Sequence, residues 1–118
     1  MVFGWHLTLD MHKLDASISS PEKVELWVRE LVKKIDMVPY GEPLIKHFGE
    51  GELEGITAVQ LIMTSSIVAH FCDHPRTGYI DVFSCKEFDY EVVKKWTLEC
   101  FGGEIFGQNT LIRGDDMV

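Results

Sequence analysis

The sequence is poor in cysteine and in basic residues, and each shortage excludes a class of protein. Its three cysteines, Cys72, Cys85 and Cys100, are an odd number without zinc-knuckle spacing, so we expect neither a disulfide framework nor a metal site. Eleven basic residues against 19 acidic ones give a net charge of −8, which argues against nucleic acid or an anionic membrane as a partner. The sequence has no apolar run of membrane-spanning length and no signal-peptide pattern at its start, so we expect a cytoplasmic protein.

The bulk composition is that of one folded domain. Hydrophobic residues make up 46% of the 118 positions, which is enough for a core of ordinary size. The mean hydropathy of +0.03 and the charged fraction of 25% are typical of a globular chain. Because there is no internal repeat and no linker, we expect a single domain over residues 1–118.

Apolar runs rich in β-branched and aromatic residues predict six strands. Their expected ranges are 2–9, 43–48, 56–63, 67–71, 79–85 and 104–112. The hydroxyl cluster Thr64–Ser66 is predicted to form a tight connection or bulge between the third and fourth of these strands. Residues 49–55 are acidic and rich in glycine, which indicates a mobile surface loop, with cation binding by its glutamates as the less favoured alternative. Residues 113–116 are expected to form a polar tail.

Two segments have the apolar spacing of helices. Ser19, Ser20 and Pro21 suit a helix start, and Glu22 has capping-box spacing from Ser19, so a helix is predicted over 21–36. A second helix is predicted over 88–101, ending at Gly102. Most connections between strands are too short for crossovers, which favours antiparallel pairing with both helices on one face. The expected fold is an α+β two-layer sandwich whose other sheet face is partly apolar, which favours a homodimer or a higher assembly.

Chemistry-bearing side chains lie near the predicted strand ends. Ser65, His70 and Cys85 are separated by five and fifteen residues, and Gly78 to Cys85 reads Gly-Tyr-Ile-Asp-Val-Phe-Ser-Cys. Taken singly, each of the three has an ordinary structural explanation as a turn hydroxyl, a strand histidine or a buried thiol. Together with Gly4-Trp5-His6-Leu7 near the start and Arg113-Gly114 near the end, they resemble the prokaryotic S-adenosylmethionine decarboxylase family over almost the whole chain.

This resemblance implies an enzyme that makes its own cofactor. Ser65 would attack the carbonyl of Thr64, the chain would break between the two residues, and Ser65 would become a pyruvoyl group, which acts as the electron sink for loss of CO₂. His70 would serve as the processing base and Cys85 as the proton donor to the substrate carbon. The resemblance also implies S-adenosylmethionine as substrate, a role in spermidine biosynthesis, and an active site that draws on a neighbouring subunit.

The sequence departs from the family pattern next to these positions. Thr64 stands where the family has glutamate, and Ser66 stands where it has histidine. After His70 the family has Thr-Trp-Pro-Glu, whereas this chain has Phe71-Cys72-Asp73-His74. Thr57, Phe71 and Asp73 are therefore the candidate substrate-binding residues. The alternatives are a decarboxylase of another amino acid, such as arginine or ornithine, or a diverged, unprocessed relative that binds a small molecule or a partner.

Overall fold

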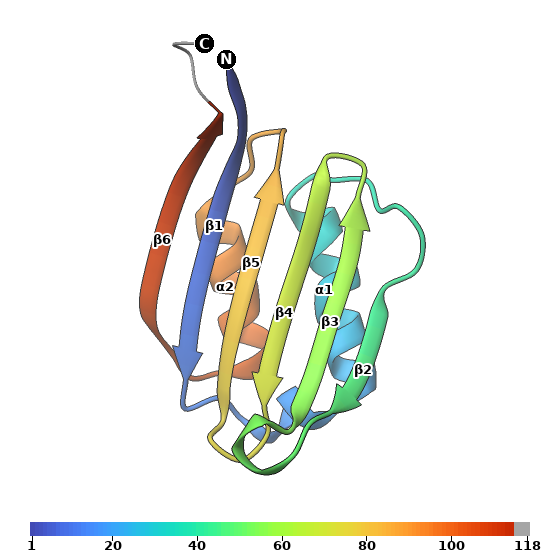
Figure 1. Cartoon of the computed structure of the whole chain (residues 1–118), viewed down its shortest axis with the longest axis vertical. Coiled ribbons are helices and arrows are strands. Elements are labelled where there is room, and N and C mark those ends of the chain that lie inside the picture. Colours follow the sequence, from blue (N-terminus) through green and yellow to red (C-terminus); the bar gives the residue numbers. More distant parts are fainter. Residues whose placement is uncertain (115–118) are drawn as a thin grey trace.

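The computed structural model describes residues 1–114 and forms two layers, a six-stranded sheet and a pair of helices that lie together behind it (Figure 1). Every pair of neighbouring strands is antiparallel, in the order β2-β3-β4-β5-β1-β6. The elements are β1 (Val2–His12), η1 (Ala16–Ser19), α1 (Pro21–Lys34), β2 (Leu44–Phe48), η2 (Gly51–Leu53), β3 (Gly55–Ile62), β4 (Ser65–Cys72), β5 (Thr77–Ser84), α2 (Tyr90–Phe101) and β6 (Glu104–Gly114). The predicted α+β sandwich and its order of strands and helices are confirmed.

Several boundaries differ from those predicted, and β1 continues to His12 instead of ending at residue 9. β4 begins at Ser65, so the two serines of the hydroxyl cluster belong to the strand, and the turn consists of Met63 and Thr64. The loop 49–55 contains the short helix η2. α2 begins two residues late because Asp89 caps it, its side chain accepting the Glu91 N–H. β6 continues to Gly114 because it pairs with β1 to its end, so the expected tail loses residues 113 and 114, while 115 and 116 lie outside the described residues.

The start of α1 differs from the predicted capping box. Ser20, not Ser19, is the capping residue, because its hydroxyl accepts the Lys23 N–H at 3.3 Å. The Ser19 hydroxyl instead donates to Asp73 at 2.8 Å. Pro21 occupies the first helical position as predicted, where its missing N–H costs no hydrogen bond. The cap thus leaves Ser19 free to support a residue at the end of β4.

The core lies between the sheet and the helices. The buried stripe of α1 is centred on Trp27, whose ring meets Phe71 of β4 and Phe101 of α2 at centroid distances of 5.9 and 5.7 Å. The indole N–H of Trp27 donates to the buried Thr97 hydroxyl at 3.0 Å, which satisfies a polar group that would be costly to bury unpaired. This cluster fixes both helices against the strands that carry the candidate site residues.

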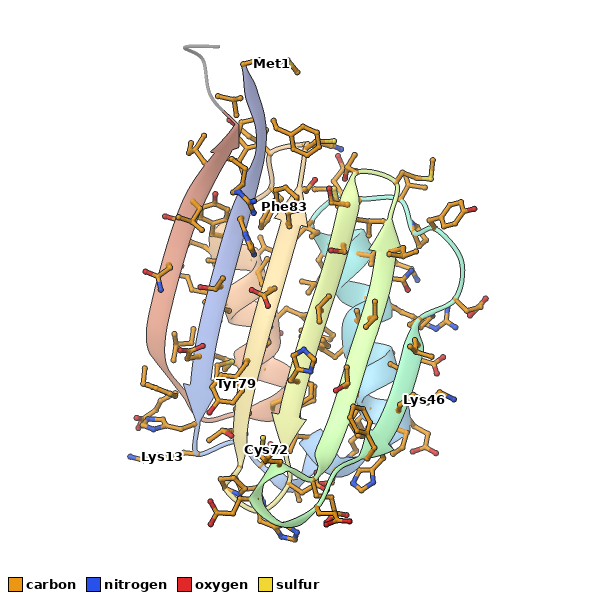
Figure 2. All side chains as sticks on the ribbon, viewed as in Figure 1. Met1, Lys13, Lys46, Cys72, Tyr79 and Phe83 are labelled. Carbon is orange, nitrogen blue, oxygen red and sulfur yellow. The ribbon has the colours of Figure 1, made fainter. Side chains whose placement is uncertain are left out.

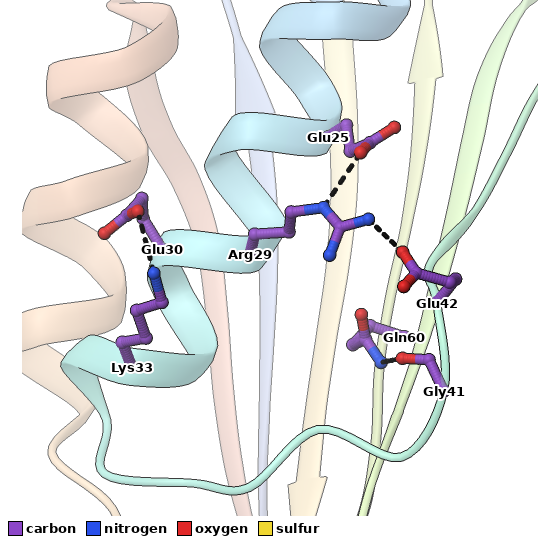
Figure 3. A network of polar contacts seen from close by, with 7 residues as sticks. All are labelled: Glu25, Arg29, Glu30, Lys33, Gly41, Glu42 and Gln60. Carbon is purple, nitrogen blue, oxygen red and sulfur yellow. Dashed lines mark hydrogen bonds and ion pairs between the residues drawn. The ribbon is translucent and has the colours of Figure 1, made fainter.

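A polar network holds the segment between α1 and β2 beside the sheet (Figure 3). Gln60 of β3 is buried and donates to the Gly41 carbonyl at 3.1 Å and to the Leu61 carbonyl at 2.7 Å. Arg29 of α1 bonds Glu25 at 2.8 Å and also contacts Glu42. The carboxylates of Glu25 and Glu42 are thus matched by one cation, and the segment after α1 is tied to both layers.

Among residues 1–114, no helix covers the other face of the sheet, and Figure 2 shows Tyr79 and Phe83 on it. Cross-strand register places Leu61, Ser66 and Phe83 in one row, which continues through His6 to Leu111. Leu61 and Leu111 are each 49% exposed, so this face is partly apolar, as expected. In the part of the chain that the structure describes, no helix is long and apolar enough to cross a membrane.

Candidate active site

Thr64, Ser65 and Cys85 lie together at the end of the sheet where β3 turns into β4 and β5 ends. Ser65 pairs with Ile62 across the hairpin and with Ser84 of β5. Cys85 follows β5 directly and is exposed. Two of the three residues predicted to carry the chemistry, Ser65 and Cys85, are therefore neighbours in the fold although twenty positions separate them in the sequence.

The hairpin places Ser65 in an unusual backbone conformation. Two-residue hairpin turns normally need positive φ angles at the turn residues. Among the described residues, neither Met63 nor Thr64 has a positive φ, and Ser65 has a φ of 152° instead. Such angles are rare for residues other than glycine and cost free energy. The backbone strain of this turn is therefore located at the peptide unit predicted to be cleaved.

The carbonyl predicted to be attacked has a hydrogen-bond donor. The Cys85 N–H donates to the Thr64 carbonyl oxygen at 2.9 Å. An N–H at this place polarises the carbonyl and would stabilise negative charge on its oxygen. Within residues 1–114, no hydrogen bond engages the Ser65 hydroxyl, so its lone pairs are available. These residues fit the requirements for forming a pyruvoyl group from Ser65.

The Thr64 side chain is fixed by a buried hydroxyl that the sequence did not indicate. Ser84 is fully buried, and its Oγ lies 2.8 Å from Thr64 Oγ1. The same Oγ accepts the Lys86 N–H at 3.0 Å, and the sulfur of Met37 lies 3.4 Å from Thr64 Oγ1. Ser84 directly precedes Cys85, and this adjacency was the one available signal for its role.

The three cysteines differ in accessibility. Cys85 is exposed at the strand end, whereas Cys72 and Cys100 are partly buried. Burial raises the pKa of the Cys100 thiol to about 11, with the nearby Glu99 charge adding to the shift, so this thiol is largely protonated at neutral pH. Cys100 therefore lacks the reactivity that an exposed thiol beside the Thr64–Ser65 peptide has.

His70 lies away from Ser65 in the same chain. At about 3.3 Å of rise per residue, the two residues are about 16 Å apart along β4. His70 is exposed on the helix-free face, and its Nδ1 lies 3.0 Å from the hydroxyl of Thr57 on β3. The structure thus joins His70 to Thr57, a predicted substrate-binding residue, and separates both from Ser65.

A hollow of about 470 Å³ surrounds the Thr57–His70 pair. Its lining includes Tyr79 and Cys72, with Phe48 and Leu53 at the side of β2 and η2. Phe71 also borders it, but the Phe71 side chain is only 2% exposed and packs its ring against Trp27 and Phe101 in the core. Asp73 lies beyond the end of β4, held by Ser19 and by His47 at 2.7 Å.

The comparisons with known proteins agree with this architecture. The crystal structure of the adenosylmethionine decarboxylase from Aquifex aeolicus matches with a TM-score of 0.81 at 20% sequence identity, over 97% of this chain and 92% of that chain, which shows a shared fold. No curated protein sequence matches significantly. The model of the S-adenosylmethionine decarboxylase family matches residues 5–114, nearly the whole chain. The chain therefore belongs to the S-adenosylmethionine decarboxylase family.

Proposed function

We propose that this protein is a self-processing, pyruvoyl-dependent decarboxylase of S-adenosylmethionine. It would act in the cytoplasm and supply decarboxylated S-adenosylmethionine for spermidine biosynthesis. Family membership supports this kind of reaction. The observation that carries the proposal is the 2.9 Å hydrogen bond from the Cys85 N–H to the Thr64 carbonyl, directly before Ser65.

Processing needs only the groups at this end of the sheet and one base. The Ser65 Oγ attacks the Thr64 carbonyl carbon, so the amide becomes an ester and the Ser65 amino group is freed. The Cys85 N–H stabilises the negative charge that develops on the Thr64 oxygen. Removal of the Ser65 α-proton expels the Thr64 carboxylate, and addition of water to the remaining dehydroalanine releases ammonia and leaves the pyruvoyl group.

A second copy of the chain would supply the base. His70 is about 16 Å from Ser65 along its own strand, too far to reach the Ser65 α-proton. The His70–Thr57 pair is exposed on the helix-free face, where a partner chain can approach it. Apolar side chains on that face, including Leu61 and Tyr79, support a homodimer or a higher assembly built through it.

In the decarboxylation, the pyruvoyl group would supply a ketone that takes up the electrons released with CO₂. Cys85 is exposed beside Ser65 and would donate a proton to the substrate carbon. The hollow at Thr57, with Phe71 at its border, is the proposed place for part of the substrate, and Asp73 is the nearby carboxylate proposed to bind it. We keep Thr57 and Asp73 as the substrate-binding residues of the proposal, whereas Phe71, also predicted to bind substrate, shapes the border of the hollow from the core.

An unprocessed relative that binds a small molecule or a partner is the second candidate function. The observation that favours it is the position of Thr64, whose β-branched side chain is tied to Ser84 and crowds the carbonyl that Ser65 would attack. Cys72 and His74, at positions where the family has tryptophan and glutamate, favour it as well.

Mass spectrometry of the denatured protein distinguishes the two functions. After incubation at neutral pH, processing is expected to give two fragments that meet between Thr64 and Ser65, the second with a blocked pyruvoyl terminus. Ser65→Ala is expected to stay whole, whereas the matched control Ser66→Ala is expected to be cleaved like the wild type. A wild-type chain that remains intact at 13.5 kDa after long incubation would contradict the decarboxylase and leave the second candidate.

A further inference from the structure

Four ionisable side chains gather at the end of the sheet opposite the Thr64–Ser65 turn, which is the end where Figure 2 labels Cys72. They are His47 of β2, Glu54 directly before β3, and Asp73 and His74 in the turn after β4. The segments that carry them are remote in the sequence and become neighbours because β2, β3 and β4 pair in order. Neither the family resemblance nor the proposed decarboxylation uses these four residues together.

The donor atoms of the cluster converge. The Nε2 atom of His47 lies 2.7 Å from Asp73 Oδ2 and 3.7 Å from Glu54 Oε2. One donor atom from each of these three residues falls within 4.8 Å of the other two. His74 lies next to this set, with its Nε2 3.3 Å from Glu54 Oε1. The arrangement therefore offers one imidazole nitrogen and two carboxylates around one point, with a second imidazole beside Glu54.

The backbone holds the cluster in place independently of its charges. The Asp73 N–H donates to the Glu54 carbonyl at 2.8 Å. Gly55 permits this approach, because a Cβ at that position would collide with the Phe71 carbonyl. The Ser19 hydroxyl donates to Asp73 Oδ1 at 2.8 Å, which fixes the carboxylate with its other oxygen toward His47. This is the outer support that metal-ligating carboxylates usually have.

We propose that His47, Glu54 and Asp73, with His74 as the fourth ligand, bind a divalent transition-metal ion such as Zn²⁺. Imidazole and carboxylate are ordinary ligands of such ions. Ligand atoms about 2.0–2.2 Å from a tetrahedral metal lie about 3.3–3.6 Å from one another, and the His47 nitrogen lies 2.7 and 3.7 Å from the two carboxylate oxygens, on either side of that range. The His74 side chain is 65% exposed, so it is free to turn its nitrogen toward the ion.

A bound ion would join the loop before β3 to the turn after β4. Leu53 and Gly55, on either side of Glu54, line the hollow that contains Thr57 and His70. Metal binding at Glu54 would therefore hold one wall of that hollow in place. The proposal does not depend on chain cleavage, since it shares only Asp73 with the proposed decarboxylase site.

Isothermal titration of the full-length protein with ZnCl₂ tests the proposal. We expect one ion per chain, binding at least 100-fold weaker in His47→Ala, and binding about tenfold weaker in Ser19→Ala because Asp73 loses its outer support. His12→Ala is the matched control, because His12 also meets a carboxylate, Glu104, at 3.1 Å, but Lys13 shares that carboxylate at 3.5 Å. Its zinc binding is expected to equal that of the wild type.

Spectra with Co²⁺ identify the ligands. Tetrahedral Co²⁺ held by nitrogen and oxygen absorbs in the visible range without a thiolate charge-transfer band, and Cys72→Ser is expected to leave this spectrum unchanged. Absence of zinc binding, equal binding by His47→Ala, or a spectrum that requires Cys72 would overturn the proposal. Circular dichroism of each variant checks that a loss of metal binding is not caused by unfolding.

Discussion

At one end of the sheet, the Thr64–Ser65 peptide is held by uncharged groups, whereas at the other end His47, Glu54 and Asp73 hold one another mainly by charge. The first end uses a backbone N–H and the fully buried Ser84 hydroxyl, which water does not reach. The second end is partly open to solvent, with His47 39% exposed and Asp73 14% exposed, and water and salt weaken ion pairs there. At the first end, directed hydrogen bonds therefore fix the position of the Thr64–Ser65 peptide. At the second end, the nitrogen and oxygen atoms of the charged side chains remain available to bind an ion.

The contacts at the charged end also shift the pKa values of His47 and Asp73. The hydrogen bond that His47 donates to the Asp73 carboxylate raises the pKa of His47 above its usual value. Desolvation acts to raise the pKa of Asp73, but the hydrogen bonds from His47 and Ser19 outweigh it and lower that pKa. Both shifts favour the charged forms, so His47 and Asp73 each stabilise the charge on the other.

The largest expected effect is on chain cleavage, when an intact Ser65 and an intact His70 are placed on different chains. Ser65→Ala and His70→Ala are each expected to abolish cleavage. In heterodimers of the two variants, isolated with two affinity tags, every chain that carries Ser65 is expected to be cleaved, because the partner supplies His70. Mass spectrometry measures the cleaved fraction. Heterodimers that stay whole while the wild type is cleaved would show that the base does not come from a second copy.

The next effect concerns the thiol beside Ser65. In processed protein, Cys85→Ala is expected to lower CO₂ release from S-adenosylmethionine by at least about 100-fold, because general acid catalysis contributes that much. Release of ¹⁴CO₂ per processed chain measures it. Cys100→Ala is the matched control and is expected to keep full activity, since burial holds that thiol protonated. Undiminished activity in Cys85→Ala would show that another group donates the proton.

A smaller effect is expected from the buried hydroxyl. Ser84→Ala leaves the Lys86 N–H without its partner and removes one of the two partners of the Thr64 hydroxyl, so it is expected to lower the free energy of unfolding by about 1–3 kcal/mol. The comparison is made in the Ser65→Ala background, where the chain is expected to stay uncleaved. Urea denaturation of Ser65→Ala and of the double variant Ser65→Ala/Ser84→Ala measures the difference in the free energy of unfolding. An unchanged midpoint would mean that the turn does not depend on Ser84.

The smallest effect on the free energy of unfolding is expected from a substitution in the His47–Glu54–Asp73 cluster without bound metal. Glu54→Gln removes one charge but keeps the side chain's shape, and is expected to change the free energy of unfolding by less than about 0.5 kcal/mol, as for other exposed ion pairs. The same urea titration provides the measurement. A loss as large as that of Ser84→Ala would remove the energetic difference between the two ends.

Local patterns in the sequence were sufficient for the elements and for the layers. Apolar periodicity identifies strands and helices because one face of each must be buried. The capping residue was misplaced by one position because Ser19 and Ser20 are chemically equal candidates, and only the contact between Ser19 and Asp73 distinguishes them. The start of β4 was placed late because serines resemble a turn until their pairing with Ile62 and Ser84 is known.

The sequence by itself determined the family, the α+β sandwich and the residue types available for the chemistry. Tertiary structure decided which of them meet. Five positions of strand separate Ser65 from His70 by about 16 Å, because an extended chain advances about 3.3 Å per residue. Pairing of β2, β3 and β4 brings His47, Glu54 and Asp73 together from positions up to 26 residues apart. Sequence spacing could not reveal either result, since contact between strands depends on register.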